Sequence, residues 1–257
     1  MIEQYALPVT FIAVLLLSLS WHEAAHAWVA DKLGDPTARS LGRITLNPIK
    51  HMHPVLSVAL PAFLYLANLP VIAGGKPVPI NPTFFKKRSR DFMLVALAGP
   101  GSNLLIALLC GVGYAVSVST GWIGGHQEVV IGQAARMGMD HVTAGPPSMF
   151  DDARTLLSNP SGIDSLLQLA LVLGAALNVA LAVFNMFPLP PLDGSRVVGW
   201  LLPNSLKGSW YRLDRFGIIM VFVVIFYLGG GRVVLGAVLW ALTWLTVGVD
   251  QLIALLT

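Results

Sequence analysis

Long runs of apolar residues with almost no charge are the feature that most constrains this chain. The first contains the stretch PVTFIAVLLLSL, and comparable runs recur around residues 92–120, 165–187 and 216–256. About 20 predominantly apolar residues suffice for an α-helix to cross the hydrocarbon core of a bilayer. Charged residues make up only 11% of the sequence, whereas soluble domains carry about 25%. The sequence therefore predicts an all-α, polytopic protein of the cell membrane.

The apolar runs and the loops between them indicate a single integral membrane domain over residues 1–257. We expect three core helices, C-terminal helices after them, and a small β-hairpin or re-entrant element between the first two core helices. The expected parts are core helices at about 5–33, 92–120 and 165–187, a re-entrant or β region at about 40–85, an external loop at about 121–164, and C-terminal helices at about 216–256.

Basic residues gather in three loops: after the first core helix, before the second, and before the C-terminal helices. They are Lys32, Arg39, Arg43 and Lys50, then Lys76, Lys86, Lys87, Arg88 and Arg90, then Lys207, Arg212 and Arg215. Segment 121–164 is instead mainly acidic. Because cytoplasmic loops of membrane proteins carry the excess of Lys and Arg, we place the basic loops in the cytoplasm and 121–164 outside. The net charge of +3 then reflects orientation, and no nucleic-acid partner is expected.

A weaker apolar run at 55–73 has cytoplasmic loops on both sides. A segment with both ends on one side of the membrane cannot cross it once, so we expect a re-entrant segment. Pro61 and Pro70 suit irregular backbone, which is tolerated at membrane depth when it is buried in protein. The alternative is an ordinary short span, since counting of basic residues has exceptions.

The sequence HEAAH places ionisable side chains at the end of the first apolar run. On a helix, His22 and His26 lie on one face, with Glu23 beside them. The pattern H-E-x-x-H supplies two zinc ligands and a general base in metallohydrolases. The alternative is a pair of satisfied core histidines with a glutamate at the interface. Ionisable groups within a membrane helix are functional candidates by default, so we favour the metal interpretation.

A catalytic zinc site needs a third protein ligand, and Asp193 in FNMFPLPPLDGSR is the best candidate. Three prolines make this stretch irregular, which would let a ligand turn inward. The alternative for Asp193 is the N-cap of the following helix. If 55–73 is re-entrant, Asp193 lies toward the cytoplasmic half with His22 and His26. If 55–73 crossed the membrane, Asp193 would lie on the opposite side from the histidines.

Three motifs in order, HEAAH, LAGPGSN and NMFPLPPLDG, resemble those of the site-2 protease family of intramembrane zinc metalloproteases. The stretches GDPTARSLGRITLNPIKHMHP and KPVPINP are similar to the compact bacterial and archaeal branch that lacks a PDZ domain. The resemblance implies one catalytic Zn²⁺ held by His22, His26 and Asp193, with Glu23 as the base that activates water. It also implies a substrate-contacting role for Asn103.

The resemblance further implies regulated intramembrane proteolysis. The partners would be a transmembrane-helix protein substrate and the lipid bilayer, and the active site would face the cytoplasmic side. The sequence does not indicate an oligomeric state. Two other functions stay open: a proteolytically silent membrane chaperone or scaffold, and a metal transporter that uses the same ligands. An intact Glu23 argues against the first, and the absence of visible repeats argues against the second.

Unwinding a substrate helix would require capture of an extended segment, for which an exposed strand edge is suited. SLGRITLNP alternates in a strand-like manner, and GKPVPINP could form a second strand, so we predict a substrate clamp here.

Other polar residues have more than one interpretation. Asn103 could stabilise the oxyanion or form a helix–helix hydrogen bond. Asn178 and Asn185 raise the same question, with packing favoured. His51 and His53 in KHMHP could bind a second metal, gate access, or lie at the level of the lipid headgroups.

Overall fold

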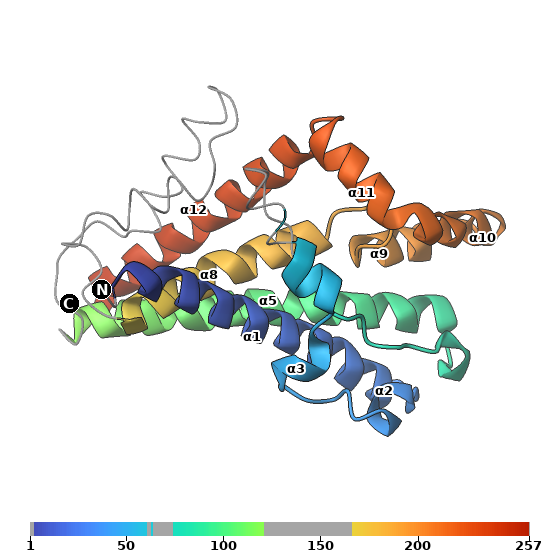
Figure 1. Cartoon of the computed structure of the whole chain (residues 1–257), viewed down its shortest axis with the longest axis horizontal. Helices are drawn as coiled ribbons and strands as arrows, with labels where there is room; N and C mark the ends of the chain where they lie inside the picture. Colours follow the sequence, from blue (N-terminus) through green and yellow to red (C-terminus); the bar gives the residue numbers. More distant parts are fainter. Residues whose placement is uncertain (1–2, 61–62, 64–73, 121–165, 257) are drawn as a thin grey trace.

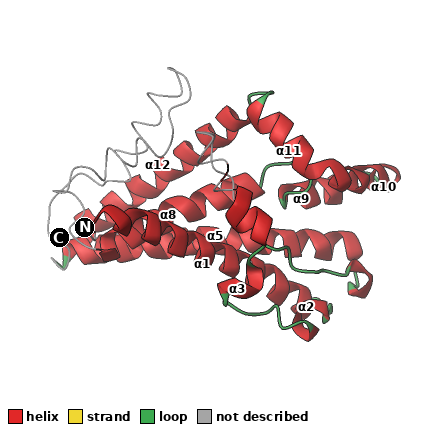
Figure 2. Ribbon diagram, viewed as in Figure 1, coloured by secondary structure: helices red, strands yellow, loops and turns green. Residues whose placement is uncertain are grey.

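The computed structural model describes residues 3–60, 63, 74–120 and 166–256, and this part of the chain is helical with no strand (Figure 2). The α-helices are α1 (Glu3–Lys32), α2 (Thr37–Ser40), α3 (Pro48–His51), α5 (Arg88–Ser119), α8 (Leu166–Asn185), α9 (Gly194–Leu201), α10 (Asn204–Arg212), α11 (Gly217–Phe226) and α12 (Gly230–Leu256). Shorter turns are the π-helix η1 (Pro54–Ala59) and the 3-10 helices η2 (Pro82–Phe84) and η3 (Leu213–Phe216). The prediction of a mainly helical chain is confirmed for these residues.

Helices α1, α5 and α8 pack against one another, and α12 lies across α5 and α8 (Figure 1). Mostly small or β-branched side chains fill the contact of α5, α8 and α12, which lets the helices approach closely. The buried residues of this cluster are Ala107, Ala175, Val179, Val238 and Leu242. The centre of the molecule is therefore a bundle of long apolar helices.

Three of the described helices are long and apolar enough to cross a membrane: Val9–Lys32, Arg88–Ser117 and Gly230–Leu256. Helix α8 is apolar but shorter over Leu169–Asn185. Leucines on the outer face of α5 are half exposed, as lipid-facing side chains would be. They are Leu104, Leu105, Leu108 and Leu109. These helices agree with the predicted membrane class of the protein.

One end of the bundle carries the short helices, and the two chain termini lie at the other (Figure 1). Helices α2 and α3 follow α1 at the first end, where α9 and α10 also lie. Asp35, fully buried, fixes this region because its carboxylate accepts hydrogen bonds from the backbone N–H of Thr37 and of Asn81. The end of α1 is thereby joined to the segment that precedes α5.

The predicted β-hairpin is wrong for the described residues. The backbone around the first predicted strand, SLGRITLNP, shows why. Residues 37–43 form a short helix and a turn, in which Gly42 donates to Arg39 and Arg43 donates to Ala38. Gly42 has φ of +62°, a left-handed conformation that favours glycine. The alternation of apolar and polar side chains in SLGRITLNP therefore accompanies a turn.

In the region of the second predicted strand, residues 74–81, backbone N–H groups donate to partners outside any sheet. Lys76 donates to the carbonyl of His51, and Val78 donates to the carboxylate of Glu23. Pro77 and Pro79 have no N–H to donate. No donors remain along 76–79 to pair with a neighbouring strand.

The 55–73 run lies largely outside the described residues, but its flanks are joined. The Ser57 hydroxyl accepts the N–H of His53 and donates to the carbonyl of Gly74 at 2.7 Å. The two flanks therefore lie together, which is the arrangement that a re-entrant segment requires. The predicted external loop at 121–164 lies outside the described residues.

Candidate metal centre

Three ligand atoms converge at the end of the bundle that carries the short helices. His22 and His26 lie one turn apart on α1, and Asp193 lies in the loop between α8 and α9. The two histidine Nε2 atoms are 3.0 Å apart, and Asp193 Oδ2 lies 3.2 Å from one and 3.3 Å from the other. Among the described residues, this is the one group of three or more potential ligands that is close enough to hold an ion.

The partners of the two imidazoles decide which nitrogen of each is free. His26 Nδ1 donates to the backbone carbonyl of Val95 at 2.7 Å, and His22 Nδ1 donates to Asn103 Oδ1 at 2.5 Å. In a neutral imidazole the other nitrogen is then an acceptor. Both Nε2 lone pairs therefore point at a buried Asp193 oxygen that has no hydrogen-bond donor. Three electron-pair donors at this separation form an arrangement that a bound cation would bridge.

The geometry fits Zn²⁺. Zinc bonds of 2.0–2.1 Å in a tetrahedral site put neighbouring ligand atoms about 3.3–3.4 Å apart. The three observed separations of 3.0–3.3 Å lie close to this value. Two imidazoles and one carboxylate make up the protein ligands of several catalytic zinc sites, which keep the fourth position open. The donor set could thus hold one zinc ion with a position left for water or substrate.

Asp193 lies at the start of α9, yet its side chain does not cap that helix. Its carboxylate is directed to the two histidines instead. The turn that carries it is tight, because a Cβ at Gly194 would lie 2.2 Å from the Met186 carbonyl oxygen. The LDG sequence therefore combines a ligand with the glycine that lets its loop fold back.

Gly99 on α5 faces both imidazoles. A Cβ on this residue would lie 2.4 Å from His26 Nε2 and 2.5 Å from His22 Cε1, far closer than non-bonded atoms can approach. Only glycine lets α5 pack against the two ligands. The LAGPGSN sequence thus contributes a close contact at Gly99 and a hydrogen bond at Asn103.

Glu23 lies beside the ligands, half-buried, and is not one of them. Its Oε2 accepts the backbone N–H of Val78 at 2.9 Å. Because Pro77 and Pro79 flank Val78, this N–H is the one donor of the Pro-Val-Pro stretch. The Val78 side chain is buried with Ala27 and Ala38. The segment before α5 therefore holds the Glu23 carboxylate in place.

Asn103 is fully buried, and both of its polar atoms are engaged. Its oxygen contacts His22, and its nitrogen donates to Asn178 Oδ1 at 2.6 Å. The geometry favours the helix–helix hydrogen bond over the contact with substrate. Asn185 donates to the Leu181 carbonyl of its own helix.

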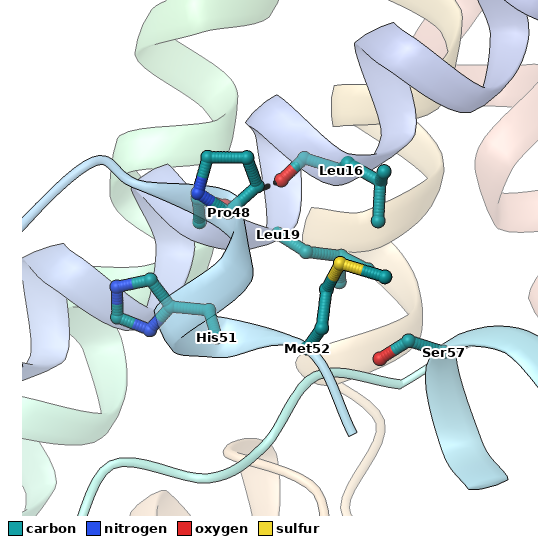
Figure 3. A pocket seen from close by; sticks show the side chains of 7 residues that line it. Leu16, Leu19, Pro48, His51, Met52 and Ser57 are labelled. Carbon is teal, nitrogen blue, oxygen red and sulfur yellow. Dashed lines mark hydrogen bonds between the residues drawn. The ribbon is translucent and has the colours of Figure 1, made fainter. Parts of the chain in front are cut away.

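His51 and His53 do not join the metal centre. His51 is buried and donates from Nε2 to the Thr45 carbonyl at 2.8 Å. It borders a small pocket, and its ring points away from the other side chains that are labelled in Figure 3. The pocket is lined by Leu16, Leu19, Ser20, Pro48, His51, Met52 and Ser57. Neither histidine belongs to a group of three potential ligands in the described part of the chain. A second metal at this place stays a prediction.

Sequence reasoning named the three candidate ligands and Glu23 but missed the contacts that Gly99, Val95 and the N–H of Val78 make with them. A glycine in an apolar helix gives no sign of what it faces. A signal was available for Val78, since alternating prolines leave one N–H between them.

Known proteins resemble this chain over most of its length. The family described as Peptidase family M50 matches residues 10–229, which is most of the chain. The chain belongs to peptidase family M50, the site-2 protease family. YwhC of Bacillus subtilis strain 168, named as a candidate zinc metalloprotease, is 33% identical over 227 residues, covering 87% of this chain and 83% of YwhC.

Two mycobacterial proteins, both called Rip2 and named as candidate zinc metalloproteases, match over shorter stretches. The protein of Mycolicibacterium smegmatis is 37% identical over 101 residues, 38% of this chain and 37% of its own length. The protein of Mycobacterium tuberculosis H37Rv is 39% identical over 101 residues, 39% of this chain and 38% of its own length. No solved structure matches the chain at a significant level. This M50 protein is thus a zinc metalloprotease with the apolar helices of a membrane protein.

Proposed function

We propose that this M50 protein is an intramembrane endopeptidase that hydrolyses peptide bonds in or near transmembrane segments of other membrane proteins. The observation that carries the proposal is the placement of three electron-pair donors, 3.0–3.3 Å apart, on and beside a helix long and apolar enough to cross the bilayer. A protease with its ligands on such a helix can reach bonds that soluble proteases cannot.

His22, His26 and Asp193 would hold one Zn²⁺. When bound, the ion supplies Lewis acidity, which polarises a carbonyl and lowers the pKa of water to about 7. Glu23 accepts the proton of the attacking water and passes it to the leaving amine. The contact with Val78 occupies one carboxylate oxygen and leaves the other for this transfer.

The orientation of the site follows from charge. His22 and His26 lie in the second half of α1, before the basic residues Lys32 and Arg39. Because cytoplasmic loops carry the excess of Lys and Arg, the multi-pass chain would place the metal centre toward the cytoplasmic side. The hydrogen bond between Ser57 and Gly74 supports this topology, because a re-entrant segment begins and ends on the same side of the membrane.

Removing the N–H that holds Glu23 should slow catalysis without loss of zinc. In Val78→Pro the Glu23 carboxylate loses its backbone donor. A hydrogen bond to a charged group contributes about 1.5–3 kcal/mol, so we expect turnover to fall about 10-fold or more. Val78→Ala, which keeps the N–H and loses buried methyl groups, is the control. Equal turnover of the two variants at equal zinc content would show that this contact does not position the base.

The proposed function is tested by cleavage of a single-span test protein in lipid vesicles. We expect the purified enzyme to cut it, a chelator to stop cleavage, and added Zn²⁺ to restore it. Zinc flux into the vesicles without cleavage would instead identify a transporter. A zinc-loaded protein that binds the test protein without cutting it would identify a scaffold.

A further inference from the structure

Three buried hydrogen bonds join the core helices at the level of the metal ligands, in a ring that is closed by the backbone of α1. His22 of α1 contacts Asn103 of α5, which contacts Asn178 of α8, which contacts Ser18 of α1. Asn103 and Asn178 are fully buried, and Ser18 is 4% exposed. Ser18 lies one turn before His22, so the ring begins and ends on the helix that carries the ligands.

Asn178 on α8 sets which group donates and which accepts in each of these hydrogen bonds. Asn178 Nδ2 donates to the backbone carbonyl of Gly174 at 2.8 Å and to Ser18 Oγ at 2.8 Å. A carbonyl can only accept, so the Nδ2 side of the Asn178 amide must face Gly174. Reversing this amide would bring two carbonyl oxygens together in a buried site, where an unpaired polar atom costs about 1–3 kcal/mol. Asn178 Oδ1 must therefore face Asn103.

The same reasoning fixes the donor and acceptor atoms of Asn103 and then of His22. Because Asn178 presents an oxygen, Asn103 must present its Nδ2, and the distance between these atoms is 2.6 Å. Asn103 Oδ1 is then left facing His22 Nδ1. An amide oxygen can only accept, so His22 carries its proton on Nδ1 and its lone pair on Nε2, the atom that faces Asp193.

We infer that Asn178 is a positioning residue for zinc: through Asn103, it holds His22 in the tautomer that can bind the metal. Asn178 itself touches no ligand atom. The partner of the second imidazole, the Val95 carbonyl, needs no such support because backbone oxygen cannot be reversed. Groups that orient ligand histidines typically change metal affinity 10–100-fold when removed. This inference rests on the proposed zinc site.

The test is a double-mutant cycle on zinc affinity, measured by competition with a chelator in detergent. Asn178→Leu removes the group that directs Asn103, and we expect affinity to fall about 10–100-fold. In Asn103→Asp, either carboxylate oxygen accepts the His22 proton, so Asn178 no longer sets the tautomer, and its Oδ1 faces an oxygen in place of a donor. Adding Asn178→Leu to this variant removes that contact between two oxygens and should not lower zinc affinity.

The outcomes separate a positioning role from packing and from failure of the site. An equal fall in affinity from Asn178→Leu in both backgrounds would show that Asn178 only packs the helices and would overturn the inference. Asn185→Leu on the same helix, whose amide donates to the Leu181 carbonyl of that helix, should leave zinc affinity unchanged. If His22→Ala retains full zinc affinity, the proposed site itself is wrong.

Discussion

Replacing Gly99 by alanine should weaken zinc binding strongly while the chain stays folded. The added methyl group would lie 2.4 Å from His26 Nε2 and 2.5 Å from His22 Cε1, so both imidazoles must move. Neither can move without losing its Nδ1 partner, Val95 in one case and Asn103 in the other. We expect zinc affinity to fall more than about 100-fold, beyond the usual effect of changes outside the ligands. Metal analysis of purified protein measures this.

Gly101 provides a matched control two residues away on the same helix. A Cβ at Gly101 meets no atom within 4 Å. Alanine is the better helix former by about 1 kcal/mol, so Gly101→Ala should keep its zinc and unfold at the same temperature or higher. Wild-type zinc affinity in Gly99→Ala would mean that α5 does not pack against the ligands as described.

Replacing Glu23 by glutamine should remove proteolysis and leave zinc in place. Glutamine keeps an oxygen that can accept the Val78 N–H, so the side chain should stay where it is. It has no carboxylate to take a proton from water. A positioned general base contributes about 10²–10⁴-fold, and we expect the turnover number to fall by this factor. Zinc content and cleavage rate are measured on the same preparation.

A Glu23→Gln variant that cuts as fast as the wild type with its zinc retained would exclude Glu23 as the base. Loss of both zinc and cleavage would be a different result, because it would make Glu23 part of the metal site. A catalytic zinc site needs three protein ligands and an open position, which His22, His26 and Asp193 would provide, so we expect zinc content to be retained.

The helices and the cluster of candidate ligands could be predicted because the membrane imposes simple rules on sequence. A spanning helix needs a run of apolar residues, and α1 and α5 were found within a few residues of their ends. Polar residues inside such runs stand out, which is how His22 and His26 were found. Asp193 required a topological argument as well, because its loop is far from them in sequence.

The strand prediction failed because side-chain alternation says nothing about where backbone N–H groups go. In residues 74–81 the N–H of Val78 goes to Glu23 and that of Asn81 goes to Asp35. The alternating prolines were the available warning, since Pro77 and Pro79 cannot donate to a ladder. An extended segment bound by side chains and a paired strand can share one sequence pattern.

The groups behind the ligands could not be predicted, because they depend on how helices face one another. Gly99 and Asn178 are ordinary residues of apolar helices until α5 and α8 are packed against α1. A sequence can show that Asn178 is costly to bury without a partner. It cannot show that the partner is Asn103, from a helix 75 residues away.

The most direct test of the account is to locate the bond that the enzyme cuts. A single-span test protein is incubated in lipid vesicles with the zinc-loaded enzyme, and the products are identified by mass spectrometry, with Glu23→Gln as the blank. The account predicts a cut within the apolar segment or at its border. Cuts confined to the soluble parts of the test protein, equally fast in a version that lacks the membrane segment, would contradict it.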